Sequence, residues 1–301
     1  MIYNLGSINA DYFYDLPHLP GPGETLAASA MSVGLGGKGA NQSVAAALAG
    51  AEVCHIGAVG PDGAWAVDRM AGYGVDTTFV RQVEVATAHA IVMVDTWGEN
   101  QIVIYPGANH VQDVNVITKA LDSADPGDWL MLQNETSLQV EAARLAQKRG
   151  MSVAYSAAPF SADAVKPILE FTSLLILNQV EAEQLARALG MSVGSLPVDT
   201  ILVTKGGHGA EWIDTKSGET VSVPAFSVDV VDTTGAGDTF AGYTVAGLSL
   251  GLSPKDAFRR ASAAAAIKVT RKGTADAIPS ADIVTEFLDQ LPTNGAADPQ
   301  S

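Results

Sequence analysis

The chain is poor in cysteine and in basic residues. Its 301 residues include a single cysteine, Cys54, which lies in an apolar run and predicts a small buried core residue. One cysteine excludes a disulfide framework, so we expect a reducing, cytoplasmic location. Lysine and arginine number 17 against 33 acidic residues, for a formal net charge of -16. That balance disfavours nucleic acid and anionic membrane surfaces as partners.

Long apolar runs are missing as well. No stretch reaches the roughly 18 apolar residues that a membrane-spanning helix needs, and residues 1–15 contain no base. We therefore expect neither a membrane span nor a signal peptide. Residues 292–301 are polar with two prolines, which predicts a disordered tail. The rest could form one large α/β domain or two smaller ones, and we expect a single domain over residues 1–291.

Strand-like and helix-like segments alternate along most of the chain. Apolar runs predict strands at residues 51–58, 129–133, 152–155, 174–177 and 201–204, and helical spacing predicts helices at 62–72, 138–149 and 180–189. This rhythm predicts an α/β fold with a mostly parallel sheet and helices on both faces. Two stretches, 12–35 and 86–105, alternate without helices, and we expect them to form a small antiparallel β lid. Residues 206–224 also predict antiparallel strands, which would cover one edge of the sheet.

A glycine-rich turn, DTTGAGDTFAG at residues 232–242, precedes a helix-like run. Upstream of it, hydrophobic residues alternate with polar ones from 221 to 228, as in a half-buried strand. Such a turn exposes backbone N–H groups at the positive end of a helix dipole and predicts an anion site. The donors would be Gly235, Ala236 and Gly237. Asp238 would repel a phosphate there unless it took a proton from a hydroxyl that attacks phosphorus; the alternative is a plain helix start capped by Asp or Thr.

A second glycine cluster, GLGGKGANQ at residues 34–42, precedes an alanine-rich helix. Its glycines match the dinucleotide pattern G-x-G-x-x-G, which leaves an NAD-dependent dehydrogenase as an alternative. The match is weak, because the pattern should follow the first strand directly. A phosphate-binding P-loop is excluded, because Gly39 stands where a serine or threonine must hold magnesium.

The two clusters together resemble the two signatures of the ribokinase family of sugar kinases, also called the PfkB family. The first signature matches residues 36–42 and the second 232–242. Further matches follow in order: GSINAD at 6–11, PGET at 22–25, GEN at 98–100, PGAN at 106–109, NQVE at 178–181 and VTRKG at 269–273. Matches in this order, spread from residue 6 to residue 273, are far more specific than any single one.

The resemblance implies a kinase that transfers the γ-phosphate of ATP to a primary hydroxyl of a small neutral sugar, with D-ribose favoured. Another neutral sugar or a nucleoside is the main alternative, and a non-catalytic sugar-binding sensor on the same fold is a weaker one. The implied sugar-site residues are Asn9, Asp11, Gly36, Gly37, Lys38, Asn41, Glu135 and the base Asp238. Asn9 and Asp11 are expected to end the first strand, where a plain turn pair is the alternative. A solvated lysine is the alternative at Lys38, and helix capping at Glu135.

The resemblance also implies a nucleotide site and two ions. The nucleotide-site residues would be Asn178, Thr204, Gly206, Gly209 and Gly237. Glu181 would organise Mg²⁺ through water, or be no more than a first-turn helix glutamate. A monovalent cation, K⁺, would be held mostly by backbone carbonyls of Asp232, Thr234, Lys268, Arg271 and Gly273. Lys268 stands where a small residue is usual and Ala277 lacks a helpful hydroxyl, so the lysine ammonium replacing the ion is the competing possibility.

The resemblance further suggests a homodimer in which two lids clasp each other. An antiparallel lid exposes strand edges and an apolar face, and a sheet of this size is marginal alone. Candidate residues for the apolar face are Ile91, Met93, Ile102 and Ile104.

Overall fold

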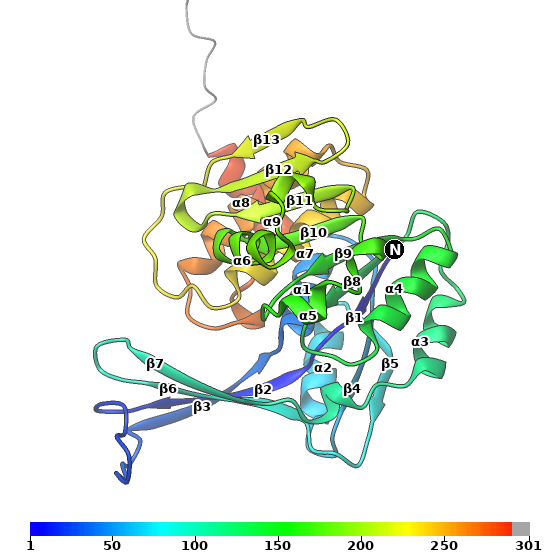
Figure 1. Cartoon of the computed structure of the whole chain (residues 1–301). Helices are drawn as coiled ribbons and strands as arrows, with labels where there is room; N and C mark the ends of the chain where they lie inside the picture. The colour runs from blue at the N-terminus through cyan, green and yellow to red at the C-terminus, as the bar shows by residue number, and fades with distance from the viewer. Residues whose placement is uncertain (291–301) are drawn as a thin grey trace, which may run out of the picture.

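A computed structural model describes residues 1–290 and places nine strands in one twisted sheet (Figure 1). The strand order is β13-β12-β11-β10-β9-β8-β1-β4-β5. Neighbours from β5 to β11 pair in parallel, and only β12 and β13 are antiparallel. The bounds are β1 (Ile2–Leu5), β4 (Val53–Val59), β5 (Asp76–Gln82), β8 (Trp129–Gln133), β9 (Ser152–Ser156), β10 (Leu174–Asn178), β11 (Thr200–Thr204), β12 (Ala210–Asp214) and β13 (Thr220–Val223). The prediction of a mostly parallel sheet is confirmed; the expected tail at 292–301 lies outside the described residues.

Helices cover both faces of this sheet, as the alternating pattern predicts. Side chains of α1, α7 and α8 pack into one hydrophobic core, and those of α3, α4 and α6 into the other. The bounds are α1 (Lys38–Leu48), α2 (Ala64–Gly72), α3 (Val114–Leu121), α4 (Gln139–Lys148), α5 (Ala162–Val165), α6 (Gln179–Leu189), α7 (Ala236–Ser249), α8 (Pro254–Val269) and α9 (Ala281–Asp289). Among the described helices, none is long and apolar enough to cross a membrane.

A second sheet of four strands projects from the main body at the lower left of Figure 1 and forms the lid. Its order is β3-β2-β6-β7, with bounds β2 (Asn9–Asp15), β3 (Ala30–Gly36), β6 (Ala88–Val94) and β7 (Asn100–Tyr105). Both hairpins are antiparallel, as predicted, but they join through a parallel pair, β2 with β6. The pair is parallel because both strands start at the main body, where Asn9 lies opposite Ala88, and run outward together.

Two local predictions need correction. Asn9 and Asp11 do not end the first strand, which stops at Leu5; they begin β2. The chain leaves the main sheet at Gly6, where an added Cβ would lie 2.5 Å from the Gly39 Cα atom. The alternation from 221 to 228 is a strand only to the end of β13, because Pro224 has no N–H to continue the ladder.

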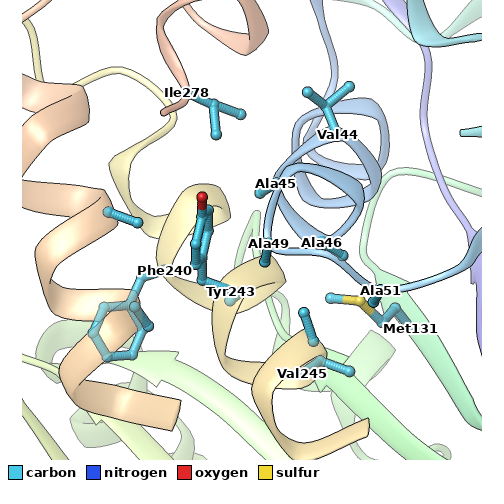
Figure 2. Close-up of a cluster of buried hydrophobic side chains, with 14 of the residues drawn as sticks. Val44, Ala45, Ala46, Ala49, Ala51, Met131, Phe240, Tyr243, Val245 and Ile278 are labelled. Atoms are coloured by element: carbon cyan, nitrogen blue, oxygen red, sulfur yellow. The ribbon is translucent and has the colours of Figure 1, made fainter. Parts of the chain in front are cut away.

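The packing of α1 against α7 sets the position of the two glycine-rich turns (Figure 2). The two helices approach closely at Gly242, because a Cβ there would lie 2.6 Å from the Ala45 Cβ atom and 2.6 Å from the backbone carbonyl oxygen of Gln42. Figure 2 shows Ala45 on α1 and Ala49, its C-cap residue, on the side of α1 that faces Tyr243 of α7. Small side chains on α1 therefore let the helices pack closely, which brings Asn41 and Gln42 of the first turn of α1 to Asp238 of α7.

Candidate active site

Asp238 lies in the first turn of α7 and is buried, with 8% of its surface exposed. Two amides from α1 hold its carboxylate. Asn41 Nδ2 donates to one oxygen at 3.2 Å, and Gln42 Nε2 donates to the other at 3.1 Å. Each carboxylate oxygen has a second lone pair, so the group can still accept a proton from a hydroxyl placed beside it.

The turn before α7 supplies backbone donors at the positive end of the helix dipole. Gly235 is the N-cap residue, with φ 73°, a conformation that favours glycine. Of the three donors predicted, the Ala236 N–H donates to the Thr233 carbonyl within the turn. Gly235 and Gly237 are the donors whose N–H groups have no partner among the described residues.

Asp11 faces the start of α1 from the base of the lid. Its Oδ1 atom is buried without a hydrogen-bond partner in the described part of the chain, and so is Asn41 Oδ1. Gly36 lets the Asp11 carboxylate pack onto the backbone, because a Cβ at that glycine would lie 1.9 Å from Oδ2. Burial raises the pKa of Asp11 to about 7, with further contributions from Glu135 and Asp238. These two unpaired oxygens are suited to accept hydrogen bonds from sugar hydroxyls.

Glu135 lies in the turn between β8 and α4 and caps α1, not α4. Its Oε2 atom accepts from the Lys38 backbone N–H at 3.0 Å and from the Ser7 hydroxyl. Gly37, the N-cap residue of α1, makes no side-chain cap, so Glu135 takes that role from the turn after β8. The charge of Asp238 raises the pKa of Lys38, and Glu135 and Glu181 add to the effect. Lys38 is therefore an ammonium held among carboxylates and not a freely solvated one.

Asn9 is partly engaged before any ligand is considered. Its Oδ1 atom accepts from Asn109 Nδ2 at 2.8 Å, and the Oδ1 atom of Asn109 accepts from the Ile8 N–H. Both asparagines are buried. The turn at residues 106–109, which follows the lid strand β7, is thereby tied to the start of β2, and Asn9 keeps its own amide nitrogen for a ligand.

A cavity of about 160 Å³ joins the predicted catalytic and magnesium residues. Lys38, Gly237 and Asp238 line it together with Asn178 and Glu181 at the start of α6. The last two form a reciprocal capping box: Asn178 Oδ1 accepts from the Glu181 N–H, and Glu181 Oε2 accepts from the Asn178 N–H, both at 2.8 Å. The capping alternative for Glu181 is thus realised, and the residue also lines the cavity.

A larger cavity of about 470 Å³ adjoins the first, and Thr204 and Gly237 line both. The predicted residues Gly206 and Gly209 lie on its wall. Its apolar side was missed by sequence reasoning and consists of Phe226, Val228, Val230, Phe240, Ala265 and Val269. The alternating hydrophobic residues after β13 were the feature of the sequence that could have revealed this wall, because they do not continue as a strand.

The loops before α7 and after α8 are tied together at Asp232. Asp232 Oδ1 accepts from the Thr234 N–H and Oδ2 from the Gly273 N–H. Burial acts to raise the pKa of Asp232, but these backbone hydrogen bonds outweigh it and lower the pKa. Lys268 is fully buried, and its ammonium donates to the Asp232 carbonyl at 2.9 Å. Burial lowers the pKa of Lys268. Arg271 begins the turn after α8, where its N–H donates to the Lys268 carbonyl.

The second glycine cluster does not have the geometry of a dinucleotide site. Gly34 and Gly36 lie on β3, which belongs to the lid and not to the main sheet. Gly39 is required for another reason, because a Cβ there would lie 2.3 Å from the Gly6 Cα atom. Gly39 and Gly6 therefore let the start of α1 lie close to the chain that follows β1. Among the described residues, no cluster of three histidine, cysteine or acidic side chains could hold a metal ion by itself.

The site therefore combines a buried carboxylate, two helix starts and a cavity large enough for a nucleotide. Comparison with known proteins agrees with this chemistry. The profile of the pfkB family of carbohydrate kinases matches residues 1–281. A ribokinase of Haemophilus influenzae is 36% identical over 299 residues, covering 95% of this chain and 97% of that protein. A deoxyribokinase of Salmonella typhi is 32% identical and covers 94% and 97%. The solved structure of Arabidopsis thaliana ribokinase with ribose and ATP has a TM-score of 0.83 at 28% identity, covering 95% and 98%.

Proposed function

The chain belongs to the pfkB family of carbohydrate kinases, and we propose that it transfers the γ-phosphate of ATP to a primary hydroxyl of D-ribose. One observation carries this proposal. Asp238 lines the small cavity that shares Gly237 and Thr204 with the nucleotide-sized one, so a proton acceptor stands where the two cavities meet. A sugar-binding sensor would have no use for a carboxylate at that junction.

The residues of the chain support a direct transfer. Asp11 and Asn41 would hold sugar hydroxyls with their unpaired oxygens, and the reacting hydroxyl would lie beside Asp238. As its oxygen forms a bond to the γ-phosphorus, the bond from that phosphorus to the bridging oxygen of ADP breaks and the proton passes to Asp238. The N–H groups of Gly235 and Gly237 and the Lys38 ammonium would stabilise charge on the transferring group.

The nucleotide is assigned to the larger cavity. Its apolar wall, which includes Phe226, Val228 and Val269, is suited to a flat purine base. The turn after β11, with Gly206 and Gly209, would lie along the phosphates and bring the γ-phosphate toward Gly237. ATP as phosphoryl donor and a buried free thiol at Cys54 are both compatible with the expected cytoplasmic location, which stays a prediction.

The start of α6 fits an outer ligand set for Mg²⁺. Asn178 and Glu181 line the cavity with Asp238, and Mg²⁺ bound to phosphates usually keeps several waters that such groups can hold. When bound, the ion would neutralise charge on the phosphates. Asn178 and Glu181 would orient its water ligands from their rigid capping box.

The surroundings of Lys268 do not fit a potassium ion coordinated by the Asp232 carbonyl. The lysine ammonium already donates to that oxygen, and a second cation beside a buried ammonium would be repelled. We therefore favour the competing possibility: Lys268 ties the α7 and α8 loops together, and the enzyme works without K⁺.

The sugar pocket is suited to a neutral substrate. The first 110 residues contain three bases, Lys38, Arg69 and Arg81. Arg69 pairs with Asp276 on the surface, and Arg81 donates to the Val111 carbonyl. Only Lys38 faces the site, and it is already surrounded by acids. A second phosphate on the sugar would thus meet carboxylates without an arginine to pair with it.

A substrate panel tests the function. ADP release with magnesium-ATP should be highest, by kcat/KM, for D-ribose among ribose, 2-deoxyribose, fructose, adenosine and fructose 6-phosphate. The relative named deoxyribokinase makes 2-deoxyribose the second candidate. Preference for fructose 6-phosphate would refute the neutral pocket, and no turnover of any sugar would refute the kinase.

We also propose a homodimer through the lid. The hydrophobic residues Met31, Val33, Ile102, Val103, Ile104 and Tyr105 on β3 and β7 are exposed to solvent. These outer strands of the lid also leave edges unpaired within the described chain. A second lid would cover both.

A further inference from the structure

A network of polar side chains crosses the core behind Asp238. Its members come from β1, α1, β4 and β8, and all of them are fully buried: Asn4, Gln42, Ser43, His55 and Gln133. Most other core positions of these strands are apolar. Buried polar groups destabilise a core unless they are hydrogen-bonded. Five such side chains in one place therefore call for an explanation.

At the end of the network farthest from Asp238, a backbone carbonyl determines which atom of each hydrogen bond is the donor. A carbonyl oxygen only accepts, so His55 Nε2 donates to the Gly6 oxygen at 3.1 Å. Burial lowers the pKa of His55 to about 4, so the ring is neutral near pH 7 and Nδ1 is an acceptor. The Ser43 hydroxyl therefore donates to Nδ1 at 2.8 Å.

The assignment of donors and acceptors continues from Ser43 through Asn4 to Gln133. Asn4 Nδ2 donates to Ser43 Oγ at 2.8 Å and to the Gly39 carbonyl at 2.9 Å. The oxygen of Asn4 is thereby turned to Gln133 and accepts from its Nε2 atom at 2.9 Å. The same Nε2 atom donates to Gln42 Oε1 at 2.8 Å. Every donor along this path meets an acceptor.

Gln42 is the end of the network and the link to the site. Because its oxygen accepts from Gln133, its nitrogen points to Asp238 Oδ1 at 3.1 Å. A flipped Gln42 amide would set an oxygen against the carboxylate and a nitrogen against the Gln133 nitrogen. The network thus permits only one orientation of this amide.

We propose that Gln133, held by Asn4, is a positioning residue for phosphoryl transfer that orients Gln42 so that its amide donates to Asp238. The proposal rests on the proposed function, because the orientation of Asp238 matters for a hydroxyl that it deprotonates. A carboxylate fixed by two amides presents its remaining lone pairs in one direction, and misplacing a catalytic base by a small distance lowers turnover strongly.

Gln133→Met tests the proposal, because it keeps most of the volume and removes both donated hydrogen bonds. We expect kcat to fall roughly 10–150-fold, which corresponds to the loss of about 1.5–3 kcal/mol for one hydrogen bond to a charged group, with the KM for ribose within about threefold. Tyr155→Phe is the matched control. It removes a buried hydroxyl that donates to Asn134, in the core on the other face of the sheet, and should leave kcat unchanged.

A double-mutant cycle separates positioning from general loss of core structure. If Gln133 acts through Gln42, then Gln133→Met should lower kcat little further in a Gln42→Met background. Multiplying losses in the double variant, or a normal kcat in Gln133→Met, would overturn the proposal. Gln133→Leu, which also removes both donated hydrogen bonds, replaces Gln133→Met if that variant fails to fold, and its kcat should also fall.

The orientation of Gln42 can be followed without turnover. In protein labelled with ¹⁵N-glutamine, the side-chain amide signals of Gln42 are assigned by their loss in Gln42→Met. They should shift in Gln133→Met and stay in place in Tyr155→Phe; unshifted signals in Gln133→Met contradict the proposal. An inactive wild-type enzyme would refute the proposed function, whereas this spectrum would still decide the positioning.

Discussion

Replacing Asp11 with asparagine should stabilise the protein without sugar at alkaline pH, although it weakens sugar binding. Asp11 is buried at 8% exposure, and burial together with Glu135 and Asp238 raises its pKa from 3.8 to about 7. The folded protein therefore keeps a proton between about pH 4 and pH 7 that the unfolded chain releases. The free energy of unfolding falls as pH rises through this window and is constant above it.

The shift sets the size of the effect. A difference of about 3 pKa units at about 1.4 kcal/mol each corresponds to a ceiling of about 4 kcal/mol above pH 7. Asparagine carries no charge, so its free energy of unfolding does not fall in this way. The stability of Asp11→Asn relative to the wild type should therefore increase as pH rises. At roughly 2 °C per kcal/mol for a chain of this size, the gain in Tm should approach several degrees at pH 8.

Thermal unfolding without sugar at pH 5 and pH 8, at constant ionic strength, measures the gain. Asp15→Asn, at the exposed end of the same strand β2, is the matched control and should show no such trend. Ribose affinity of the wild type should rise from pH 6 to pH 8, because the ionised carboxylate accepts hydrogen bonds from two hydroxyls. A stability difference between Asp11→Asn and wild type that is equal at both pH values would refute the reasoning.

The other predictions follow from single contacts. Asp238→Asn should lower kcat roughly 10²–10⁴-fold with little change in ribose affinity, and near-normal turnover would remove the base assignment. Gly36→Ala places a methyl group 1.9 Å from the Asp11 carboxylate and should raise the ribose KM at least tenfold, whereas Gly72→Ala, which meets open space, should not. Initial rates in potassium, sodium and a bulky organic cation should be equal, and Lys268→Ala should become potassium-dependent; potassium activation of the wild type would contradict the ammonium assignment. Light scattering at micromolar concentration should give a dimer that Ile104→Lys weakens, and a wild-type monomer would count against the lid interface.

Local sequence patterns were sufficient for most strands and helices of the main sheet, although not for β5 or α3, and for the two hairpins of the lid but not for the parallel pair that joins them. The apolar run at residues 129–132 predicted β8 at residues 129–133 without error, because a strand buried on both faces is mostly apolar; Gln133 is its one polar residue. The lid segments were recognisable because alternation persisted where helices were missing. By contrast, Asn9 and Asp11 were assigned to the wrong strand, because the break at Gly6 comes from contact with Gly39, far away in the sequence.

The glycine-rich turns show the same division within the site. The sequence alone determined that residues 235–238 form a glycine-rich helix start with an acid inside it, because dihedral preference and helix polarity are local properties. Which amides hold that acid and how Glu135 caps α1 depend on residues about 100 to 200 positions apart. Only the tertiary structure decided these contacts. It also decided that the Lys268 ammonium donates to the Asp232 carbonyl, because burial and hydrogen-bond geometry exist only once distant segments are packed together.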